Sequence, residues 1–235
     1  MSWRTVRPVL ALRNVGRTLG LNRLVGIWFA RGAYEDRFQA AMLAAIRPGD
    51  VVWDVGANVG LYARKFSDIA GPSGKVFAYE PSPANLQRLN EAVASRANVI
   101  VVPFALGARD GVAAFEQGKD PLGATSRIVD DMQGDPEERF EIRLASGDQL
   151  VSSGVVAIPN VIKIDTEGFE LDVLLGLPRT LREKYLRVLC IEVHFGLLEA
   201  RGLSDAPSDI ERVLVSAGFR VDWPDASHIV ATRAR

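Results

Sequence analysis

Short hydrophobic runs alternate with longer amphipathic stretches along most of this chain. The runs are rich in Val and Ile and predict β-strands, whereas hydrophobic residues that recur every three or four positions between them predict helices. The predicted strands are 51–55, 75–80, 98–107, 160–165 and 187–193. The predicted helices are one that ends before Pro48, one that runs through Phe66, and 82–95, 169–176 and 208–219.

Two of these helices carry boundary signals. Ser82 stands where an N-cap is expected and is followed by a proline, which is favourable in the first turn of a helix. Gly176 stands near the expected C-cap of a later helix. In the helix that Gly176 closes, we expect Leu171, Leu174 and Leu175 to face the core.

The end of the chain and one internal stretch depart from this alternation. Segments 219–223 and 227–233 read as two strands of a hairpin. Residues 107–148 are rich in turns and β-like, and predict a β-rich elaboration rather than a separate domain. Alternating strands and helices predict a Rossmann-like α/β fold, a mostly parallel sheet with helices on both faces, to which the hairpin adds at least one antiparallel strand.

Four predicted strands end in carboxylates, namely Asp54, Glu80, Asp165 and Glu192. Ligands of parallel sheets bind at the carboxyl ends of the strands, so these side chains are expected at one rim. Clustered carboxylates repel one another. A cationic ligand or a metal would relieve that repulsion.

The loop after the first strand, "DVGANVGL", favours a nucleoside ligand over a dinucleotide. The dinucleotide fingerprint places glycines where this loop has Asn58 and Leu61. Gly56 and Gly60 would let backbone approach a ligand, and Glu80 follows Gly60 by 20 residues, where an acid can accept hydrogen bonds from a ribose. With Asp54 facing an ammonium group, the ligand that fits is S-adenosylmethionine.

At the level of motifs, the chain resembles the FkbM family of class I S-adenosylmethionine-dependent methyltransferases. The resemblance runs from residue 32 to the last residue and implies a seven-stranded sheet whose last strand is antiparallel. The segments that carry it are "GAYED" (32–36), "RPGDVVWDVGANVGLYARKF" (47–66), "GKVFAYEPSPANLQRL" (74–89), "VIKIDTEGFELDVLLG" (161–176) and "CIEVH" (190–194).

The resemblance also implies a set of cofactor contacts. The first-loop residues would surround the methionine part, Glu80 would bind the ribose, the residues after the third strand would lie near the adenine, and Asp165 would lie near the sulfonium. Glu35 could equally serve as an acid at a helix N-terminus. The residues implied are Glu35, Asp54, Gly56, Asn58, Gly60, Glu80, Pro81, Phe104, Ala105, Leu106 and Asp165.

A sugar hydroxyl is a poor acid, so it needs a base or a metal when it attacks the methyl group. The catalytic candidates are Asp165, Glu167, Glu192 and His194. In one interpretation His194 or Glu167 takes the proton. In the other, Asp165 and Glu192, with Glu167 or His194 as a further ligand, hold Mg²⁺, which lowers the pKa of the hydroxyl. We prefer direct base catalysis because the sequence shows no compact metal-ligand spacing, and we discount the hairpin residue His228.

Charge divides the chain unevenly. Residues 1–31 hold six arginines and no acid, whereas the remainder holds 22 basic and 29 acidic residues. We interpret 1–31 as a basic arm or a docked helix, in preference to a membrane contact, and 32–235 as the methyltransferase domain. No nucleic-acid motif, signal peptide or membrane-length apolar run is present, and the single Cys190 fits a reducing compartment, so a cytoplasmic protein is expected.

The predicted function is therefore O-methylation of a hydroxyl on a sugar, glycolipid or other secondary metabolite, which is a small-molecule partner. Three alternatives remain at this point: a methyltransferase for a nitrogen nucleophile, an NAD-dependent oxidoreductase, which Asn58 disfavours, and a cofactor-binding protein of the same fold without catalysis.

Overall fold

The computed structural model describes residues 37–118, 126–129 and 139–234. The predicted basic arm at 1–31 and the candidate Glu35 lie outside these described residues. Within them, no helix is long and apolar enough to cross a membrane.

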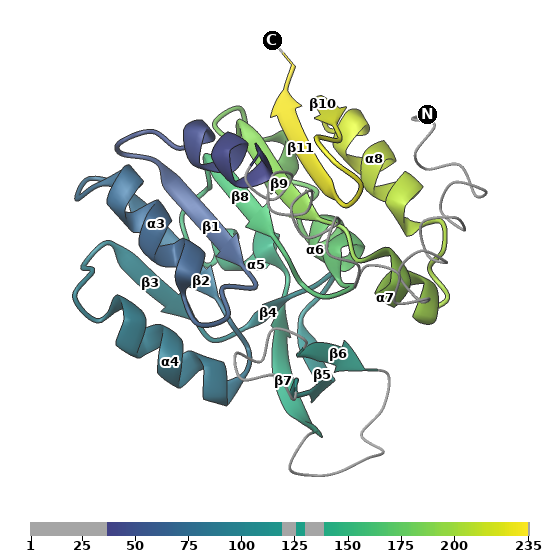
Figure 1. The fold of residues 1–235 in the computed structure, drawn as a ribbon, viewed down its shortest axis with the longest axis horizontal. Coiled ribbons are helices and arrows are strands. Elements are labelled where there is room, and N and C mark those ends of the chain that lie inside the picture. The colour runs from purple at the N-terminus through teal and green to yellow at the C-terminus, as the bar shows by residue number, and fades with distance from the viewer. Residues whose placement is uncertain (1–36, 119–125, 130–138, 235) are drawn as a thin grey trace, which may run out of the picture.

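A seven-stranded sheet forms the centre of the fold (Figure 1). The strand order is β10-β11-β9-β8-β1-β2-β3. The last strand, β11, is antiparallel to both neighbours, and the pairs among the other five strands are parallel. The predicted Rossmann-like sheet with an antiparallel last strand is thus confirmed. Its strands are β1 (Val51–Val55), β2 (Lys75–Tyr79), β3 (Val99–Val102), β8 (Val161–Ile164), β9 (Val188–Glu192), β10 (Phe219–Asp222) and β11 (His228–Arg233).

Helices cover both faces of this sheet (Figure 1). One hydrophobic cluster joins Met42, Phe66 and Leu89 from the helices on one face, and a second joins Leu174 and Ile210 on the other. Each helix buries one apolar stripe against the sheet, and burial of such side chains is the main stabilising contribution to this architecture. The helices are 37–45, α3 (Leu61–Ala70), α4 (Pro83–Val93), α5 (Gly147–Ser152), α6 (Glu170–Leu175), α7 (Phe195–Ala200) and α8 (Ala206–Ser216), with a 3₁₀ turn at Thr180–Arg182.

One helix face differs from its prediction. Leu171 and Leu174 of α6 are buried as expected, but Leu175 is 51% exposed. The buried face of α6 instead includes Val173 and Glu170, and Glu170 is fully buried. The helix is therefore turned so that an acidic side chain, rather than Leu175, points into the protein.

A second sheet lies beside the carboxyl edge of the first (Figure 1). Its strands are β4 (Ala105–Leu106), β5 (Gly111–Glu116), β6 (Arg127–Val129) and β7 (Arg139–Ala145), in the order β4-β7-β5-β6. The predicted strand at 98–107 is divided between the two sheets, because 105–106 pairs with β7 whereas 99–102 pairs with β2.

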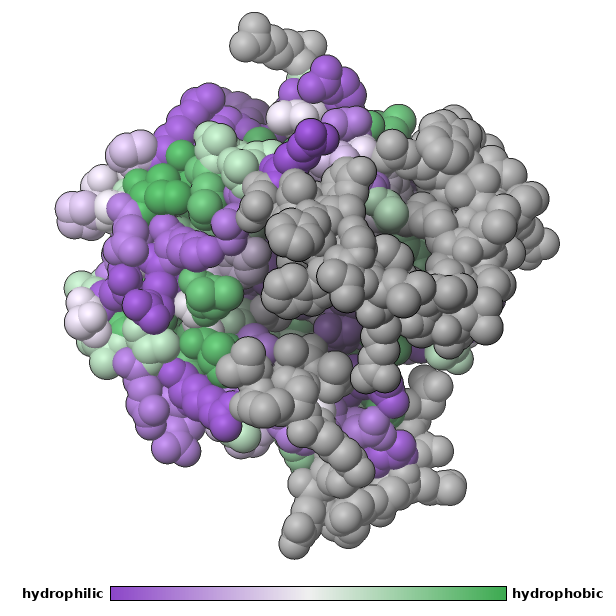
Figure 2. All heavy atoms as spheres, viewed as in Figure 1, coloured by the Kyte–Doolittle hydropathy of each residue, from purple (hydrophilic) through white to green (hydrophobic). Residues whose placement is uncertain are grey.

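Hydrophobic residues on the face drawn in Figure 2 form separate small areas among hydrophilic residues. The largest exposed hydrophobic side chains come from different elements, such as Leu61 on α3 and Val112 on β5. Scattered exposure of this kind is ordinary for a folded domain.

Candidate active site

A cavity of about 290 Å³ lies at the carboxyl edge of the central sheet, between the ends of its strands and the second sheet. Phe115 and Ile128 of the second sheet line its outer side, so that sheet completes the cavity. The central-sheet side is lined by Val55, Gly56, Asn58, Tyr79, Glu80, Pro81, Asp165, Thr166, Glu167, Glu192 and His194, and the loop after β3 adds Phe104, Ala105 and Leu106.

Glu80 is held rigidly at one end of this cavity. Its two carboxylate oxygens each accept a backbone hydrogen bond at 2.9 Å, one from the amide of Asn58 and one from that of Ser82. Burial raises the pKa of Glu80 to about 7, although these hydrogen bonds oppose the shift. A carboxylate has about four acceptor sites, so Glu80 retains capacity for further donors such as ribose hydroxyls.

Three buried side-chain oxygens of residues that line the cavity lack a hydrogen-bond partner within the described part of the chain. They belong to Asn58, Tyr79 and Thr166, and all three residues line the cavity. Buried polar atoms are normally paired. Their presence in a cavity that also has apolar walls, including Phe104 and Leu106, fits a ligand with both polar and aromatic parts, as S-adenosylmethionine has.

The two glycines of the first loop are required by packing. Both have positive φ, +81° at Gly56 and +84° at Gly60. A Cβ at Gly56 would stand 1.9 Å from the carbonyl oxygen of Asp165, and one at Gly60 would stand 2.8 Å from the side chain of Leu89. These nearest atoms belong to the protein, so the glycines allow the loop to pack closely against the start of the β8–α6 loop and against α4.

Asp54 pairs with a residue that the sequence analysis missed. It is fully buried, and its carboxylate lies 3.2 Å from the ammonium of Lys163, its cross-strand neighbour on β8. Lys163 also donates to the carbonyl of Gly56 and lies 3.4 Å from Asp165. Burial alone would lower the pKa of Lys163, but Asp54 and Asp165 outweigh burial and raise it. A lysine within the apolar run "VIKID" was the available signal.

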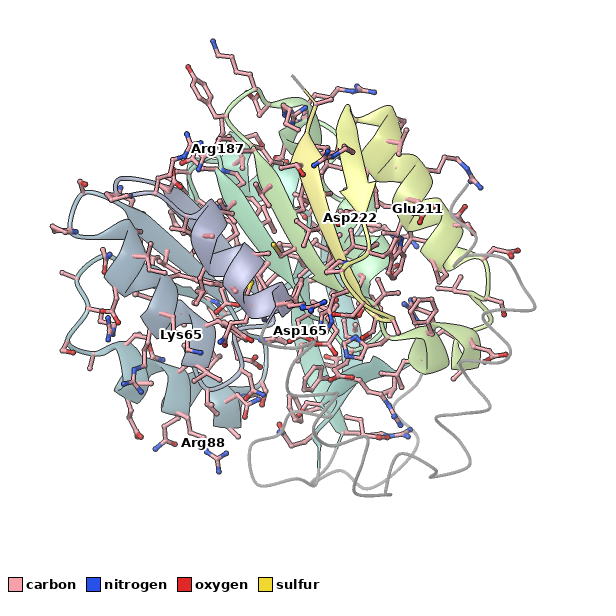
Figure 3. The ribbon with its side chains drawn as sticks, turned by 45° about the horizontal axis from the view of Figure 1, so that its top comes forward. Lys65, Arg88, Asp165, Arg187, Glu211 and Asp222 are labelled. Atoms are coloured by element: carbon pink, nitrogen blue, oxygen red, sulfur yellow. The ribbon has the colours of Figure 1, made fainter. Side chains whose placement is uncertain are left out.

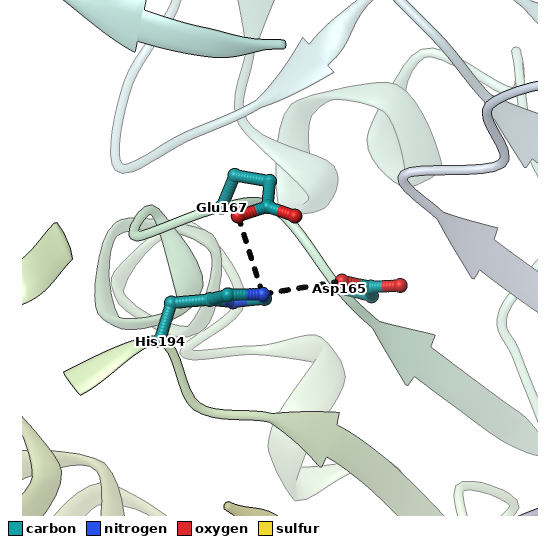
Figure 4. Close-up of side chains that lie close together, drawn as sticks. All are labelled: Asp165, Glu167 and His194. Atoms are coloured by element: carbon teal, nitrogen blue, oxygen red, sulfur yellow. Dashed lines mark ion pairs between the residues drawn. The ribbon is translucent and has the colours of Figure 1, made fainter. Parts of the chain in front are cut away.

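His194 and its acidic neighbours occupy the other end of the cavity. The Nε2 atom of His194 lies 3.3 Å from Glu167 and 3.8 Å from Asp165, as Figure 4 shows. Glu192, at the end of β9, is 3.9 Å from the same nitrogen. One ligand atom from each of Asp165, Glu167 and His194 lies within 4.8 Å of the others, so these three residues could hold a metal ion.

Glu170 explains the rotation of α6. Its carboxylate accepts from the amide of Gly168 at 2.9 Å and lies 2.8 Å from the Nδ1 atom of His194. This contact fixes the imidazole so that Nε2 faces the cavity. Neither Glu170 nor this pairing was predicted from the sequence, although two acids three residues apart, at 167 and 170, were visible there.

The carboxylates also set the charge of His194. Burial disfavours the imidazolium, but hydrogen bonds and charges from Glu167 and Glu170 outweigh it and raise the pKa of His194 to about 11. The charged imidazolium form of His194 is therefore favoured at neutral pH. His194 can accept a proton from a substrate only after it has lost its own.

Residues with an unusual backbone conformation lie in the same cavity. Among the described residues, Asn58 and Glu167 are the non-glycine positions with positive φ, +49° and +50°. Both line the cavity. Such strain is commonly retained where a side chain or amide must point at a ligand.

The structure brings most of the predicted site residues together. Figure 3 shows Asp165 near the edge of the central sheet, whereas labelled residues such as Lys65 and Arg88 point away from it. Asp54 and Gly60 are not among the residues that line the cavity. Those that do line it are Gly56, Asn58, Glu80, Pro81, Phe104, Ala105, Leu106, Asp165, Glu167, Glu192 and His194.

Comparison with known proteins decides the family. Residues 54–221 match the model of the "Methyltransferase FkbM domain", a span that includes the loop, the acids at the strand ends and His194. The chain belongs to the FkbM methyltransferase family. The predicted family and the predicted class of enzyme, a methyltransferase, are thereby confirmed.

Two curated relatives carry this FkbM similarity. The chain is 33% identical over 178 residues to the hexuronic acid methyltransferase AglP of Haloferax volcanii, covering 75% of this chain and 66% of AglP. It is 30% identical over 202 residues to the 31-O-demethyl-FK506 methyltransferase FkbM of Streptomyces tacrolimicus, covering 73% of this chain and 76% of that protein. The chain thus spans about two thirds to three quarters of these relatives.

Solved structures share the fold. A methyltransferase FkbM from Methylobacillus flagellatus KT superposes with a TM-score of 0.52 at 19% identity, over 77% of this chain and 43% of that one. The fold also occurs in SMU.1697c from Streptococcus mutans, which was solved with S-adenosylhomocysteine, with a TM-score of 0.50 at 11% identity over 87% and 97% of the chains. The FkbM chain described here therefore has the fold of S-adenosylmethionine-binding methyltransferases.

Proposed function

We propose that this protein transfers a methyl group from S-adenosylmethionine to a hydroxyl of a sugar or of another secondary metabolite. One observation supports this most: the same cavity is lined by the buried carboxylate of Glu80 and by an acid–histidine group formed by Asp165, Glu167 and His194. Glu80 suits the nucleoside of the cofactor, and the acid–histidine group suits the removal of a proton from an acceptor.

Side chains at the ends of the central strands and in the loop after β3 would bind the cofactor. Glu80 would accept hydrogen bonds from the ribose hydroxyls, and the side chains of Phe104 and Leu106 would flank the adenine. The Asp165 carboxylate, 30% exposed, would lie near the sulfonium and favour its positive charge. S-adenosylmethionine, when bound, supplies an electrophilic methyl group on that sulfonium. The chain contributes orientation and charge.

The proton of the acceptor hydroxyl would pass to the pair formed by Glu167 and His194. Their nearest side-chain atoms are 3.3 Å apart and both residues line the cavity. In this proposal Glu167 is the proton acceptor while His194 is charged, and the imidazolium holds the Glu167 carboxylate in place. Glu170 in turn holds the imidazole ring.

The class of acceptor is proposed from the relatives. AglP is named for a hexuronic acid and FkbM for 31-O-demethyl-FK506, a name that specifies an oxygen without its methyl group. Both names describe small molecules that carry hydroxyl groups. A nitrogen nucleophile is the alternative outcome of an acceptor screen.

A bound Mg²⁺ is the second candidate for activating the hydroxyl. The observation that favours it is the grouping of Asp165, Glu167 and His194, together with the Glu170 contact at the far nitrogen of His194. Metal-bound histidines commonly donate their other ring N–H to a carboxylate in this way. Calorimetry with Mg²⁺, and electron paramagnetic resonance with Mn²⁺, would detect an ion without any turnover. Asp165→Asn should abolish such binding if the ion is held here.

Cofactor titration separates the remaining classes of function. The proposal predicts saturable quenching of intrinsic fluorescence by S-adenosylhomocysteine and none by NADH. Binding of NADH alone would support an oxidoreductase. Binding of S-adenosylhomocysteine without methyl transfer to any hydroxylated or amino acceptor would favour a non-catalytic protein of the same fold.

A further inference from the structure

Two phenylalanine rings that line the cavity each have an arginine against one face. The Arg143 guanidinium carbon lies 4.4 Å from the ring centre of Phe104, and that of Arg201 lies 3.9 Å from the ring centre of Phe169. Contacts of this length are cation–π interactions. Phe104 is accounted for by the proposed adenine contact. Phe169 and Arg201 were given no role from the sequence, and the function proposed above does not use them.

Arg201 anchors the turn between β8 and α6 that carries Phe169. Its Nη1 atom donates to the carbonyl of Gly168 and to the carboxylate of Asp172, the latter at 2.9 Å. Gly168 has φ +94°, and a Cβ there would stand 2.8 Å from the side chain of Leu197 on α7. The turn is therefore packed against α7 and tied to the residue that ends this helix, so the Phe169 ring is held in place by the protein itself.

Arg201 stands behind the Phe169 ring as seen from the cavity. Phe169 lines the cavity, whereas Arg201 is not among the lining residues. The ring surface that Arg201 leaves uncovered is therefore the part that a ligand can meet. A neutral apolar surface suits this part better than a cation, because Arg201 already places a positive charge on the opposite face.

The same turn carries the proposed proton acceptor, Glu167. Glu167 and Phe169 are separated by one residue, and both line the cavity. Two residues of chain span at most about 7 Å. A flat ligand that stacks on Phe169 would therefore carry its hydroxyl groups within reach of the Glu167 carboxylate.

A pyranose ring meets both requirements at once. One of its faces presents C–H groups that pack on an aromatic ring, while hydroxyl groups project from its edge and can be directed by a few polar side chains. An open-chain polyol has the hydroxyl groups without the flat apolar face. A sugar ring is thus the acceptor that fits an aromatic wall next to a carboxylate.

We propose that Phe169 is the platform on which a pyranose acceptor stacks, with one of the sugar hydroxyls directed to Glu167. The inference rests on the proposed function and deepens it, because it selects a sugar ring among the hydroxylated acceptors. Arg201 is a positioning residue, which holds the ring and the turn without touching the acceptor.

Binding of simple glycosides tests the platform without turnover. The full-length protein is saturated with S-adenosylhomocysteine and titrated with methyl glucoside, methyl galactoside and methyl glucuronide, with glucitol as the open-chain probe. Binding is followed by saturation-transfer difference NMR. At least one glycoside should bind, with the strongest transfer to the C–H protons of one ring face, and glucitol should bind more weakly or not at all.

Substitutions of Phe169 should change the affinity for that glycoside alone. Phe169→Leu keeps apolar bulk but removes the ring, and should raise the dissociation constant of the glycoside about 2–10-fold, the value of one aromatic contact. Phe169→Tyr keeps the ring and should stay within about twofold of wild type. Both variants should bind S-adenosylhomocysteine as the wild type does, which also shows that they are folded.

Two further positions supply a positioning test and a matched control. Arg201→Met should weaken glycoside binding, and Arg201→Lys, which keeps the positive charge, should lose less. Phe219→Leu is the control, because Arg233 lies 4.2 Å from the Phe219 ring centre in the same kind of contact but Phe219 is not among the residues that line the cavity. In this control the affinities for glycoside and S-adenosylhomocysteine should both be unchanged.

The outcomes separate this inference from the function on which it rests. If the wild type binds S-adenosylhomocysteine but no glycoside, or if Phe169→Leu binds the glycoside as tightly as the wild type, the inference is overturned and methyl transfer to another acceptor still stands. Equal losses of affinity for glycoside and S-adenosylhomocysteine in Phe169→Leu also contradict it, because the ring would then serve the cofactor. Failure of the wild type to bind S-adenosylhomocysteine overturns the proposed function itself.

Discussion

Glu80 shows how one buried carboxyl can serve the fold and a ligand at once. Two backbone amides orient it, and burial keeps its pKa at about 7 rather than near 4.5. Ribose hydroxyls donate to the ionised form, so cofactor binding should favour loss of the Glu80 proton. The folded pKa is raised, so the protonated form is the preferred one in the empty protein below pH 7.

This gives a pH dependence for cofactor affinity. S-adenosylhomocysteine should bind the wild-type protein about tenfold more tightly at pH 8 than at pH 6, because below a pKa of about 7 binding must displace a proton. Glu80→Gln should bind more weakly at pH 8 and show little pH dependence. Calorimetry at several pH values measures both. A wild-type affinity that is flat between pH 6 and 8 would show that Glu80 does not meet the ligand.

The acid–histidine group gives a prediction about turnover. Glu167→Gln and His194→Ala should each lower kcat by roughly 10²–10⁴-fold, the range expected when a proton acceptor, or the group that holds it in place, is lost. Affinity for S-adenosylhomocysteine should stay within about threefold of wild type, since Glu80 is untouched. Glu141→Gln, an exposed change on β7, is the control and should be silent. If chelator abolishes wild-type turnover while His194→Ala remains active, Mg²⁺ rather than this pair activates the hydroxyl.

Among individual site residues, the sequence predicted the acids at the strand ends better than the residues that contact these acids or His194. Glu80, Asp165 and Glu192 line the cavity because each ends, or directly follows, a strand, and strand ends are readable from hydrophobic runs. Lys163 and Glu170 were missed because their roles depend on contacts across strands and between helices. No local pattern reports that a particular lysine lies opposite Asp54.

The loop between β1 and α3 is the element on which both sheet and cavity depend. Gly56 adopts φ +81°, and any Cβ there would collide with the backbone of Asp165. This loop therefore holds two strand ends at a fixed separation. The consequence is that a substitution here should affect stability as well as ligand binding.

A matched pair of glycine variants tests this. Gly71 also has positive φ, +69°, but nothing lies within 4 Å of its added Cβ. Gly71→Ala should cost about 1–3 kcal/mol, from backbone strain alone, whereas Gly56→Ala should cost more than about 3 kcal/mol because backbone must also move. Urea denaturation measures both free energies of unfolding. Equal costs would mean that the loop relaxes freely and that Gly56 is not held by β8.

The ends of helices and strands could be predicted where they depend on residues that are close in the sequence. Ser82 caps α4 as expected, and Gly176 ends α6. The prediction for Leu175 was wrong because α6 turns to bury Glu170 against His194, a contact with a residue 24 positions away. The division of 98–107 between two sheets likewise depends on pairing with β7, which hydrophobic runs do not reveal.

At the level of the whole molecule, His228 links the C-terminal hairpin to the centre of the sheet. It starts β11 and lies 3.6 Å from Glu192 at the end of β9. Its pKa is raised to about 9 from an ordinary value near 6.5, despite burial, by Asp225 and Glu192. A raised folded pKa stabilises the native state fully below pH 6.5, and this contribution is lost as pH rises through 9. The contribution of His228 to the free energy of unfolding should therefore fall in alkaline solution.

This can be measured as a difference between two proteins. The free energy of unfolding of the wild type should exceed that of His228→Gln at pH 6.5, and the difference should shrink as pH is raised to 10. Taking the difference removes titrations that both proteins share. A difference that stays constant, or grows, between pH 6.5 and 10 would show that His228 is not charged in the native state.

The central claim is that this cavity directs methyl transfer from S-adenosylmethionine to a hydroxyl. The most direct measurement supplies S-adenosylmethionine with a trideuterated methyl group and a panel of uronic acids, other glycosides and macrolides, and identifies the product by mass spectrometry and NMR. The account predicts a product heavier by one trideuteromethyl group in place of a hydrogen, with that group bonded to oxygen and S-adenosylhomocysteine formed in equal amount. A trideuteromethyl group bonded to nitrogen, or no product from a protein that binds the cofactor, would contradict it.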